Sequence, residues 1–148
     1  MNLLLIEDND YKSEQLISFL NHEFKEMQIE LRKSYHSGLK EIITNIVKYD
    51  LILLDISMPT YDIQPGEPGG DPIPQAGRNI LKDMYLRDIE AKVVVVTMYE
   101  NFVDGTQLVA LDKQFQEEFS SNYLGYVYFS PGDSGWKEAL KMKIIESL

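Results

Sequence analysis

Short apolar runs alternate along the chain with segments in which apolar residues recur at helical spacing. Continuous apolar runs at 3–6, 51–54 and 93–96 are typical of strands that are buried on both faces of a sheet. Residues 27–31 alternate between apolar and polar, as in a strand with one more exposed face, and 126–129 has the composition of another strand. We therefore expect five strands.

Five helices are expected between and after these runs. Asp8, Asn9 and Asp10 offer caps for the first helix, and Ser37 can cap the second. Three more helical patterns lie at about 78–87, 105–119 and 136–145. The residues predicted to face inward from the first three helices are Leu16, Ile17, Leu20 and Phe24; Leu39, Ile42, Ile43, Ile46 and Val47; and Ile80, Leu81, Met84 and Tyr85.

Strands separated by helices favour βαβ crossovers, which build a parallel sheet covered on both faces. The chain of 148 residues is long enough for one domain with a sizeable core and short for two. The fold class predicted is α/β, a doubly wound, five-stranded parallel sheet with helices on both faces, in a single domain over 1–148.

A Pro/Gly-rich segment at about 60–77 interrupts this alternation. Four of the six prolines fall in it, together with Gly66, Gly69 and Gly70, so it cannot continue a helix or a central strand. We expect a long loop that begins shortly after the strand at 51–54. A lid, a docking segment and a tolerated surface insertion are all compatible with its composition.

Carboxylates directly follow two of the buried runs. Glu7 and Asp8 come after 3–6, and Asp55 comes after 51–54. If these runs are neighbouring parallel strands, the three carboxylates meet at the carboxyl edge of the sheet, where open α/β sheets bind ligands. Like charges this close raise one another's pKa unless a hard cation with oxygen ligands neutralises them. The sequence therefore predicts a Mg²⁺ site.

Taken together, these features resemble the receiver domain of bacterial response regulators. The resemblance extends over most of the chain and implies a flavodoxin-like order of strands and helices. It rests on the acidic pair Glu7-Asp8, on Asp55 followed by Met58 and Pro59, and on Thr97 at the end of the 93–96 run.

The resemblance implies a role for each of these residues. Asp55 would be the phosphoacceptor, and Glu7, Asp8, Asp55 and the backbone carbonyl of Ser57 would hold Mg²⁺. Thr97 would be the switch hydroxyl that turns toward the phosphoryl group. Phosphoryl transfer needs an oxygen nucleophile and a cation that neutralises the transferred charge, and these residue types can supply both.

The chain departs from the receiver pattern in three places. The family has a lysine before the proline that follows the last strand, and here Ser130 takes its place before Pro131, or Phe129 does if the alignment slips by one. No nearby lysine substitutes, so we expect a cationic partner of the phosphoryl group to be missing. The family glycine after Asp55 corresponds to Gly77, which leaves about a dozen residues inserted. The stretch between Thr97 and the last strand is also long and acidic.

Two functions remain in view. The first is a phosphorelay receiver that accepts a phosphoryl group on Asp55 from a sensor histidine kinase or a phosphotransfer protein and then binds a downstream protein partner. The second is a pseudo-receiver that acts as a phosphorylation-independent interaction or dimerisation module, with a homodimer as one form. In neither case do we expect an enzyme beyond catalysis of its own phosphoryl transfer and dephosphorylation, because dinucleotide and phosphate-loop motifs are absent from the sequence.

Composition narrows the partners further. The net charge of −10 argues against nucleic acid and anionic lipid as ligands, since both attract clustered Lys and Arg. With no cysteine, the sequence has no disulfide, thiolate metal site or cysteine nucleophile. The apolar stretch at the start is four residues long and runs into Glu7, so we expect neither a signal peptide nor a membrane span, and a cytoplasmic location.

Overall fold

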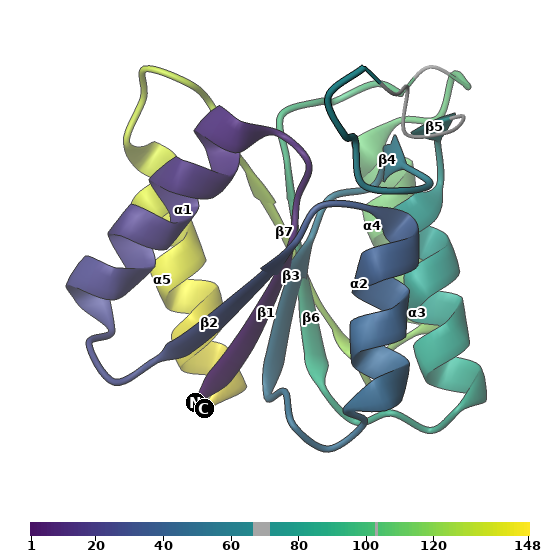
Figure 1. The fold of residues 1–148 in the computed structure, drawn as a ribbon, viewed down its shortest axis with the longest axis horizontal. Helices are drawn as coiled ribbons and strands as arrows, with labels where there is room; N and C mark the ends of the chain where they lie inside the picture. The colour runs from purple at the N-terminus through teal and green to yellow at the C-terminus, as the bar shows by residue number, and fades with distance from the viewer. Residues whose placement is uncertain (67–71, 103) are drawn as a thin grey trace.

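A five-stranded parallel sheet lies between two layers of helices in the computed structural model, which describes residues 1–66, 72–102 and 104–148 (Figure 1). The strand order is β2-β1-β3-β6-β7, and every pair is parallel. This confirms the predicted fold class. The strands are β1 (Asn2–Ile6), β2 (Gln28–Arg32), β3 (Leu51–Leu54), β6 (Lys92–Thr97) and β7 (Tyr123–Tyr128).

The helices divide between the two faces of the sheet (Figure 1). Helices α1 (Asp10–Glu23) and α5 (Gly135–Ser147) cover one face. The other face carries α2 (Tyr35–Thr44), α3 (Ala76–Leu86) and α4 (Leu108–Glu118). Among the described residues, no helix combines the length and the apolar character needed to cross a bilayer.

Successive strand residues supply two separate core layers. Leu3, Leu5 and Leu53 point toward α1 and α5, where they pack with Leu16 and Leu140. The residues between them in sequence point the other way and pack against α2, α3 and α4; they include Leu4, Ile6, Ile52 and Leu54. Because side chains alternate along a strand, an apolar run that is buried on both faces must be apolar at every position, which explains the continuous runs in the sequence.

The register of β1 and β3 fixes the edge at which the carboxylates emerge. Ile6 pairs with Leu54, so Glu7 and Asp55 each follow the last paired residue of neighbouring strands. Asn9 caps α1, because its side-chain oxygen accepts a hydrogen bond from the backbone N–H of Lys12 at 2.9 Å. The first turn of α1 is thus anchored beside the carboxyl edge of the sheet.

Helix α2 begins and ends earlier than predicted. Ser34 is its N-cap and forms a capping box with Ser37, so the prediction that Ser37 caps this helix is wrong by three residues. Two serines lie three residues apart, and either one has the chemistry of a cap. The helix ends at Thr44, which leaves Ile46 and Val47 exposed after it rather than on its apolar face.

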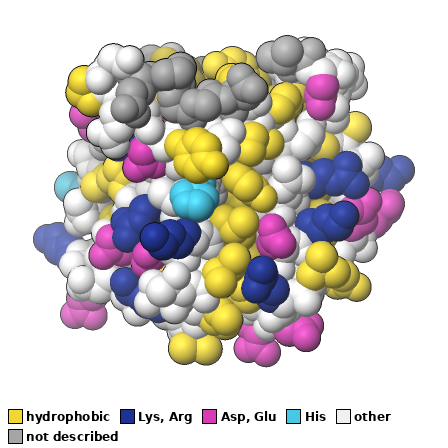
Figure 2. Space-filling model, turned by 45° about the vertical axis from the view of Figure 1, so that its right-hand side comes forward, with side chains coloured by type: hydrophobic (Ala, Val, Ile, Leu, Met, Phe, Trp, Pro, Cys, Tyr) yellow, Lys and Arg dark blue, Asp and Glu magenta, His cyan; other side chains and the backbone are white. Residues whose placement is uncertain are grey.

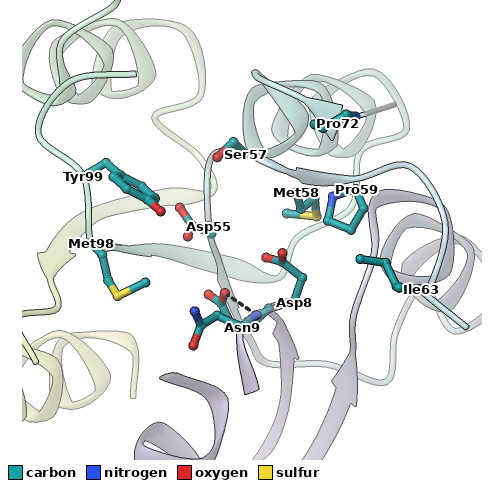
Figure 3. Close-up of a pocket in the computed structure, with 11 residues that line it drawn as sticks. Asp8, Asn9, Asp55, Ser57, Met58, Pro59, Ile63, Pro72, Met98 and Tyr99 are labelled. Carbon is teal, nitrogen blue, oxygen red and sulfur yellow. Dashed lines mark hydrogen bonds between the residues drawn. The ribbon is translucent and has the colours of Figure 1, made fainter. Parts of the chain in front are cut away.

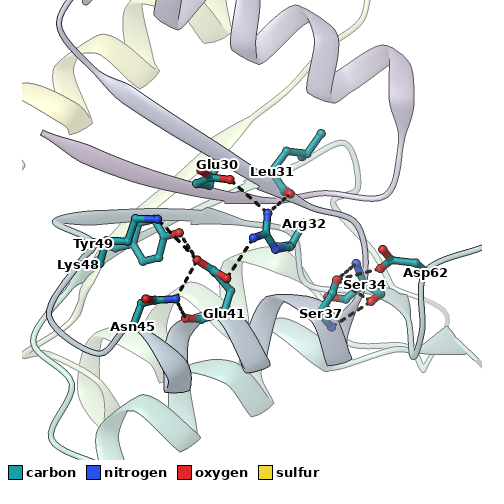
Figure 4. Close-up of polar contacts among 10 residues, drawn as sticks. All are labelled: Glu30, Leu31, Arg32, Ser34, Ser37, Glu41, Asn45, Lys48, Tyr49 and Asp62. Carbon is teal, nitrogen blue, oxygen red and sulfur yellow. Dashed lines mark hydrogen bonds and ion pairs between the residues drawn. The ribbon is translucent and has the colours of Figure 1, made fainter.

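A polar network holds α2 against the edge strand β2 (Figure 4). Glu41 accepts hydrogen bonds from Arg32 of β2 at 3.0 Å and from the Tyr49 hydroxyl at 2.5 Å. The bond from Tyr49, together with the charge of Arg32, lowers the pKa of the Glu41 carboxyl below its ordinary value. At the other end of α2, Ser37 donates to the carboxylate of Asp62 and so contacts the start of the 60–77 segment.

The Pro/Gly-rich segment contains a small element of its own. Strand β4 (Met58–Pro59), just before the segment, pairs antiparallel with β5 (Pro72–Ile73) within it, while residues 67–71 lie outside the described part of the chain. In α3, Ile80, Leu81 and Met84 are buried as predicted, but Tyr85 is half exposed, so its predicted inward direction is wrong.

On the face that Figure 2 brings forward, side chains of both charge signs are interspersed with hydrophobic ones.

Candidate functional site

The carboxyl edge of the sheet carries a pocket of about 260 Å³ (Figure 3). The predicted residues Glu7, Asp8, Asp55 and Ser57 all line it. Its outer wall comes from the segment after β3 and from the residues that follow β6; these are Met58, Pro59, Ile63, Pro72, Met98 and Tyr99. The structure therefore brings together three carboxylates and Ser57, which the sequence places in two distant segments.

Asp55 lies at the floor of this pocket and is 4% exposed. One of its carboxylate oxygens, Oδ1, accepts a hydrogen bond from the backbone N–H of Ile56 at 2.6 Å. The other, Oδ2, accepts one from the ammonium of Lys12 at 2.8 Å. Both oxygens are held, so the carboxylate is fixed in rotation at the end of β3.

Lys12 is a residue beside this pocket that the sequence analysis missed. Its side chain is fully buried, and its ammonium contacts three acceptors: Glu7 Oε2 at 2.5 Å, Asp55 Oδ2 at 2.8 Å and the Val96 carbonyl at 2.6 Å. Burial alone lowers the pKa of a lysine, but the two carboxylates outweigh it and raise the pKa of Lys12 above its ordinary value. Lys12 therefore carries its positive charge in the interior.

A signal for Lys12 was present in the helical spacing. Lys12 stands four and eight residues before the buried residues Leu16 and Leu20, so it shares their face of α1. Lysine is rarely fully buried unless it is paired, and an interpretation from residue type alone places it in solvent. The sequence offers no lysine near Pro131, but the structure brings the Lys12 ammonium from α1 to Glu7 and Asp55.

The two acids after β1 differ in their surroundings. Glu7 is 2% exposed, and burial, reinforced by the charge of Asp55, raises its pKa to about 7 despite the contact with Lys12. Its Oε1 also accepts a hydrogen bond from the backbone N–H of Asn9 at 3.1 Å. Asp8 lies at the open side of the pocket, and partial burial of its carboxyl raises its pKa as well. Burial is the main cause of both shifts, and the charge of Asp55 adds to each.

The charge balance of the pocket bears on whether its residues fit Mg²⁺. When all three acids are ionised, Glu7, Asp8 and Asp55 carry three negative charges against the single positive charge of Lys12, which leaves a formal charge of −2. Within the described ranges, no group of three His, Cys, Asp or Glu side chains is arranged to hold a metal ion, and the Lys12 ammonium lies between Glu7 and Asp55. The carboxylates of Asp8 and Asp55 and the carbonyl of Ser57 nevertheless form a set of hard oxygen donors around the pocket. Their chemistry and net charge fit Mg²⁺.

Thr97 lies at the end of β6, where the sequence predicted it. Its side chain is fully buried, and its hydroxyl oxygen accepts a hydrogen bond from the backbone N–H of Tyr99 at 3.2 Å. Met98 and Tyr99, rather than Thr97, supply the pocket wall at this point. The switch role of Thr97 stays a prediction.

Phe129, the first residue after β7, belongs to the core, and neither Phe129 nor Ser130 lines the pocket. Phe129 is 1% exposed and packs against Trp136, with ring centroids 4.9 Å apart, and against Tyr11 at 6.3 Å. Tyr11 precedes Lys12 in α1. Phe129 thus stands after β7, where the resemblance to receivers predicts a lysine nearby. Lys12 instead comes from α1, the helix that Phe129 contacts through Tyr11.

Gly77 lies against the backbone of Asp55. Its N–H donates to the carbonyl of Ile56 at 2.8 Å, which joins the start of α3 to the residue after Asp55. A Cβ atom on Gly77 would lie 2.6 Å from the Asp55 carbonyl oxygen, so only glycine allows this approach. This contact accounts for a glycine at this position, on the far side of the long segment.

No protein-family model matches the chain, but individual proteins do. It is 32% identical over 150 residues to the Detocs response regulatory protein DtcB of Enterobacter cloacae, with 99% of each chain covered. The uncharacterized protein y4jR of Sinorhizobium fredii is 29% identical over 147 residues, with 95% of each chain covered.

Solved structures share the fold. The response regulator receiver domain protein of Clostridium thermocellum has a TM-score of 0.65 at 16% identity, covering 99% of this chain and 92% of that one. The phosphorylated cyanobacterial phytochrome response regulator RcpA has a TM-score of 0.66 at 19% identity, covering 98% and 90%. The response regulator TrrA of Thermotoga maritima, in complex with Mg²⁺ and BeF, has a TM-score of 0.61 at 20% identity, covering 99% and 98%.

Proposed function

The chain belongs to the response regulator family and has the receiver fold, and from this premise we propose that it accepts a phosphoryl group on Asp55 as a phosphorelay receiver. The observation that carries the proposal is the environment of Asp55. A carboxylate at the floor of a pocket is held in one orientation by Ile56 N–H and by Lys12, with two further acids beside it. A fixed oxygen nucleophile next to cationic charge is what phosphoryl transfer requires.

The transfer itself is a displacement at phosphorus. A carboxylate oxygen of Asp55 forms the new O–P bond while the bond from phosphorus to the donor breaks, and the departing atom keeps the electron pair. In the cell, the donor would be a phosphohistidine of a sensor kinase or phosphotransfer protein, and the departing atom is then an imidazole nitrogen. The carboxylate with one negative charge becomes an acyl phosphate with two, so the site must stabilise additional negative charge.

Mg²⁺ would be held by Asp8, Asp55 and the backbone carbonyl of Ser57, with Glu7 beside them. When bound, it supplies positive charge that offsets the charge of the phosphoryl oxygens. The presence of three carboxyl groups beside a single ammonium supports this assignment. The TrrA structure, which contains Mg²⁺ and BeF, is a receiver of the same fold.

Signal output would follow from the altered charge at Asp55. We place the switch hydroxyl at Thr97. Thr97 follows Val96, whose carbonyl accepts a hydrogen bond from the Lys12 ammonium. A change at the carboxylate can reach β6 through this contact and bias the surface to which a downstream protein binds. We expect the protein to act in the cytoplasm and to catalyse no reaction other than its own phosphorylation and dephosphorylation.

Intact-mass spectrometry tests the proposal. After incubation with acetyl phosphate and Mg²⁺, the wild-type protein should gain the mass of one phosphoryl group, and Asp55→Asn should gain none. Asp50→Asn is the matched control, because Asp50 is an exposed aspartate just before the same strand, at the opposite end of the sheet, and this variant should be modified like the wild type. No adduct on the wild type under these conditions would favour a phosphorylation-independent interaction module instead.

A further inference from the structure

Lys12 occupies an unusual place for a charged side chain. It is fully buried under the pocket, and its three ammonium hydrogens are matched by three acceptors from three different strands or their ends: Glu7 after β1, Asp55 after β3 and Val96 in β6. Among the described residues that line the pocket, there is no lysine or arginine. Lys12 is therefore the cationic side chain in contact with Asp55 there.

The electrostatic setting makes this contact strong. Glu7, Lys12 and Asp55 are each less than 5% exposed, so water screens their charges little. Phosphorylation adds a second negative charge at a carboxylate whose Oδ2 lies 2.8 Å from the Lys12 ammonium. A cation that is already in position stabilises this developing charge without reorganisation at the moment of transfer.

We propose that Lys12 is the charge-neutralising residue of the phosphoryl transfer. From α1, it takes the role of the lysine expected after the last strand, where this chain has Phe129 and Ser130. This inference rests on the proposed function, since it concerns the same acceptor, Asp55. Lys12 stabilises the carboxylate before transfer and the acyl phosphate after it. It acts alongside the oxygen donors that face the open pocket, because it approaches Asp55 from the buried side.

A purely structural role for Lys12 makes a different prediction. A buried lysine that only compensates two buried acids becomes dispensable once one of those acids is neutralised as well. The double variant Glu7→Gln/Lys12→Met makes this separation. It removes one negative and one positive charge, so the formal charge of the pocket stays at −2, and the unbranched Met side chain fills the space of the lysine stem.

The experiment compares this double variant with the single variant Glu7→Gln, which keeps Lys12. Phosphorylation by acetyl phosphate at saturating Mg²⁺ is followed by intact mass, folding by circular dichroism and Mg²⁺ affinity by calorimetry. We expect the double variant to be folded and, with Mg²⁺ at a saturating concentration for each variant, to be phosphorylated about 100-fold more slowly than Glu7→Gln. Lys143→Met is the matched control, a helical lysine that donates to the Leu124 carbonyl, and should keep the wild-type rate.

The outcomes are distinct. A folded double variant that is phosphorylated within about threefold of Glu7→Gln overturns the assignment of Lys12, while the proposed function stands. Failure of the wild type itself to take up phosphate refutes the proposed function, and the role of Lys12 falls with it. If the Met variant does not fold, Glu7→Gln/Lys12→Gln decides, because the amide keeps hydrogen-bond donors without charge and should show the same loss of rate.

Discussion

Replacing Gly77 by alanine should destabilise the protein, although the residue lies inside a helix. A Cβ atom at this position would lie 2.6 Å from the Asp55 carbonyl oxygen, 2.8 Å from Leu54 Cδ1 and 3.0 Å from Ile56 Cα. Two of these three atoms belong to the backbone, which cannot rotate away as a side chain can. The start of α3 and the end of β3 must therefore move apart.

Two opposing effects set the size of the change. Alanine is favoured over glycine inside a helix by about 0.5–1 kcal/mol. Overpacking of a tight contact costs about 1–3 kcal/mol. The clash involves backbone and exceeds the propensity gain, so we expect a net loss of about 1–2 kcal/mol in the free energy of unfolding.

Urea unfolding followed by circular dichroism measures this loss. Gly135→Ala is the matched control, since Gly135 begins α5 and the nearest atom to its added Cβ is Asp133 Oδ1 at 3.6 Å. The control should be as stable as the wild type or slightly more so. A Gly77→Ala protein with an unchanged or higher midpoint would refute the close-approach explanation for this glycine.

Three further predictions concern other parts of the structure. Lys12→Met should lose about 3–5 kcal/mol of stability in urea unfolding, because it leaves two buried carboxylates without their cationic partner. Glu7→Gln/Lys12→Met should recover most of this loss, and equal losses in the two variants would contradict the ion-pair explanation. Glu41→Gln should be about 1–3 kcal/mol less stable than the wild type at neutral pH. The lowered pKa of Glu41 means that its contribution exists above the ordinary glutamate value of 4.5 and is lost as the pH falls through the lowered pKa, so the two proteins should converge in acid; a gap that persists there would count against this network. Asn122→Ala should cost about 1–3 kcal/mol, seen as a lower melting temperature, because the buried Asn122 amide donates to the Ile89 and Ala91 carbonyls, and an unchanged melting temperature would show that water replaces it.

The sheet could be predicted from the sequence because its strands carry an unambiguous signal. Continuous apolar runs are required where both strand faces are covered, and 3–6, 51–54 and 93–96 all became central strands. The position of the acids followed from the same fact, since residues after paired parallel strands emerge at one edge. Glu7 and Asp55 needed no further information to be placed together.

Features that depend on tertiary contacts were predicted less well. Ser34 and Ser37 both have capping chemistry, and only the backbone geometry decides which one begins α2. Ile46 and Val47 continue an apolar pattern beyond Thr44, where the chain has already left the helix. The local sequence pattern does not indicate where a helix ends when packing against the sheet determines that end.

Lys12 shows a second kind of limit. Lys12 contacts the acids of the site, but its position is not part of the sequence motif that suggested the site. Lysine is also a residue type that usually lies in solvent. Its burial depends on acceptors from β1, β3 and β6 that meet only in the folded protein. A lysine on the apolar face of a helix, next to predicted clustered acids, is the pattern that would have indicated it.

The most direct test of this account is to locate the phosphoryl group chemically. The protein is treated with acetyl phosphate and Mg²⁺, reduced with borohydride, which converts an acyl phosphate of aspartate to homoserine, and then mapped by peptide mass spectrometry. We predict homoserine at Asp55 and at no other aspartate. Modification at Asp8 or at a surface aspartate, with Asp55 unaltered, would contradict the assignment of Asp55 as the acceptor.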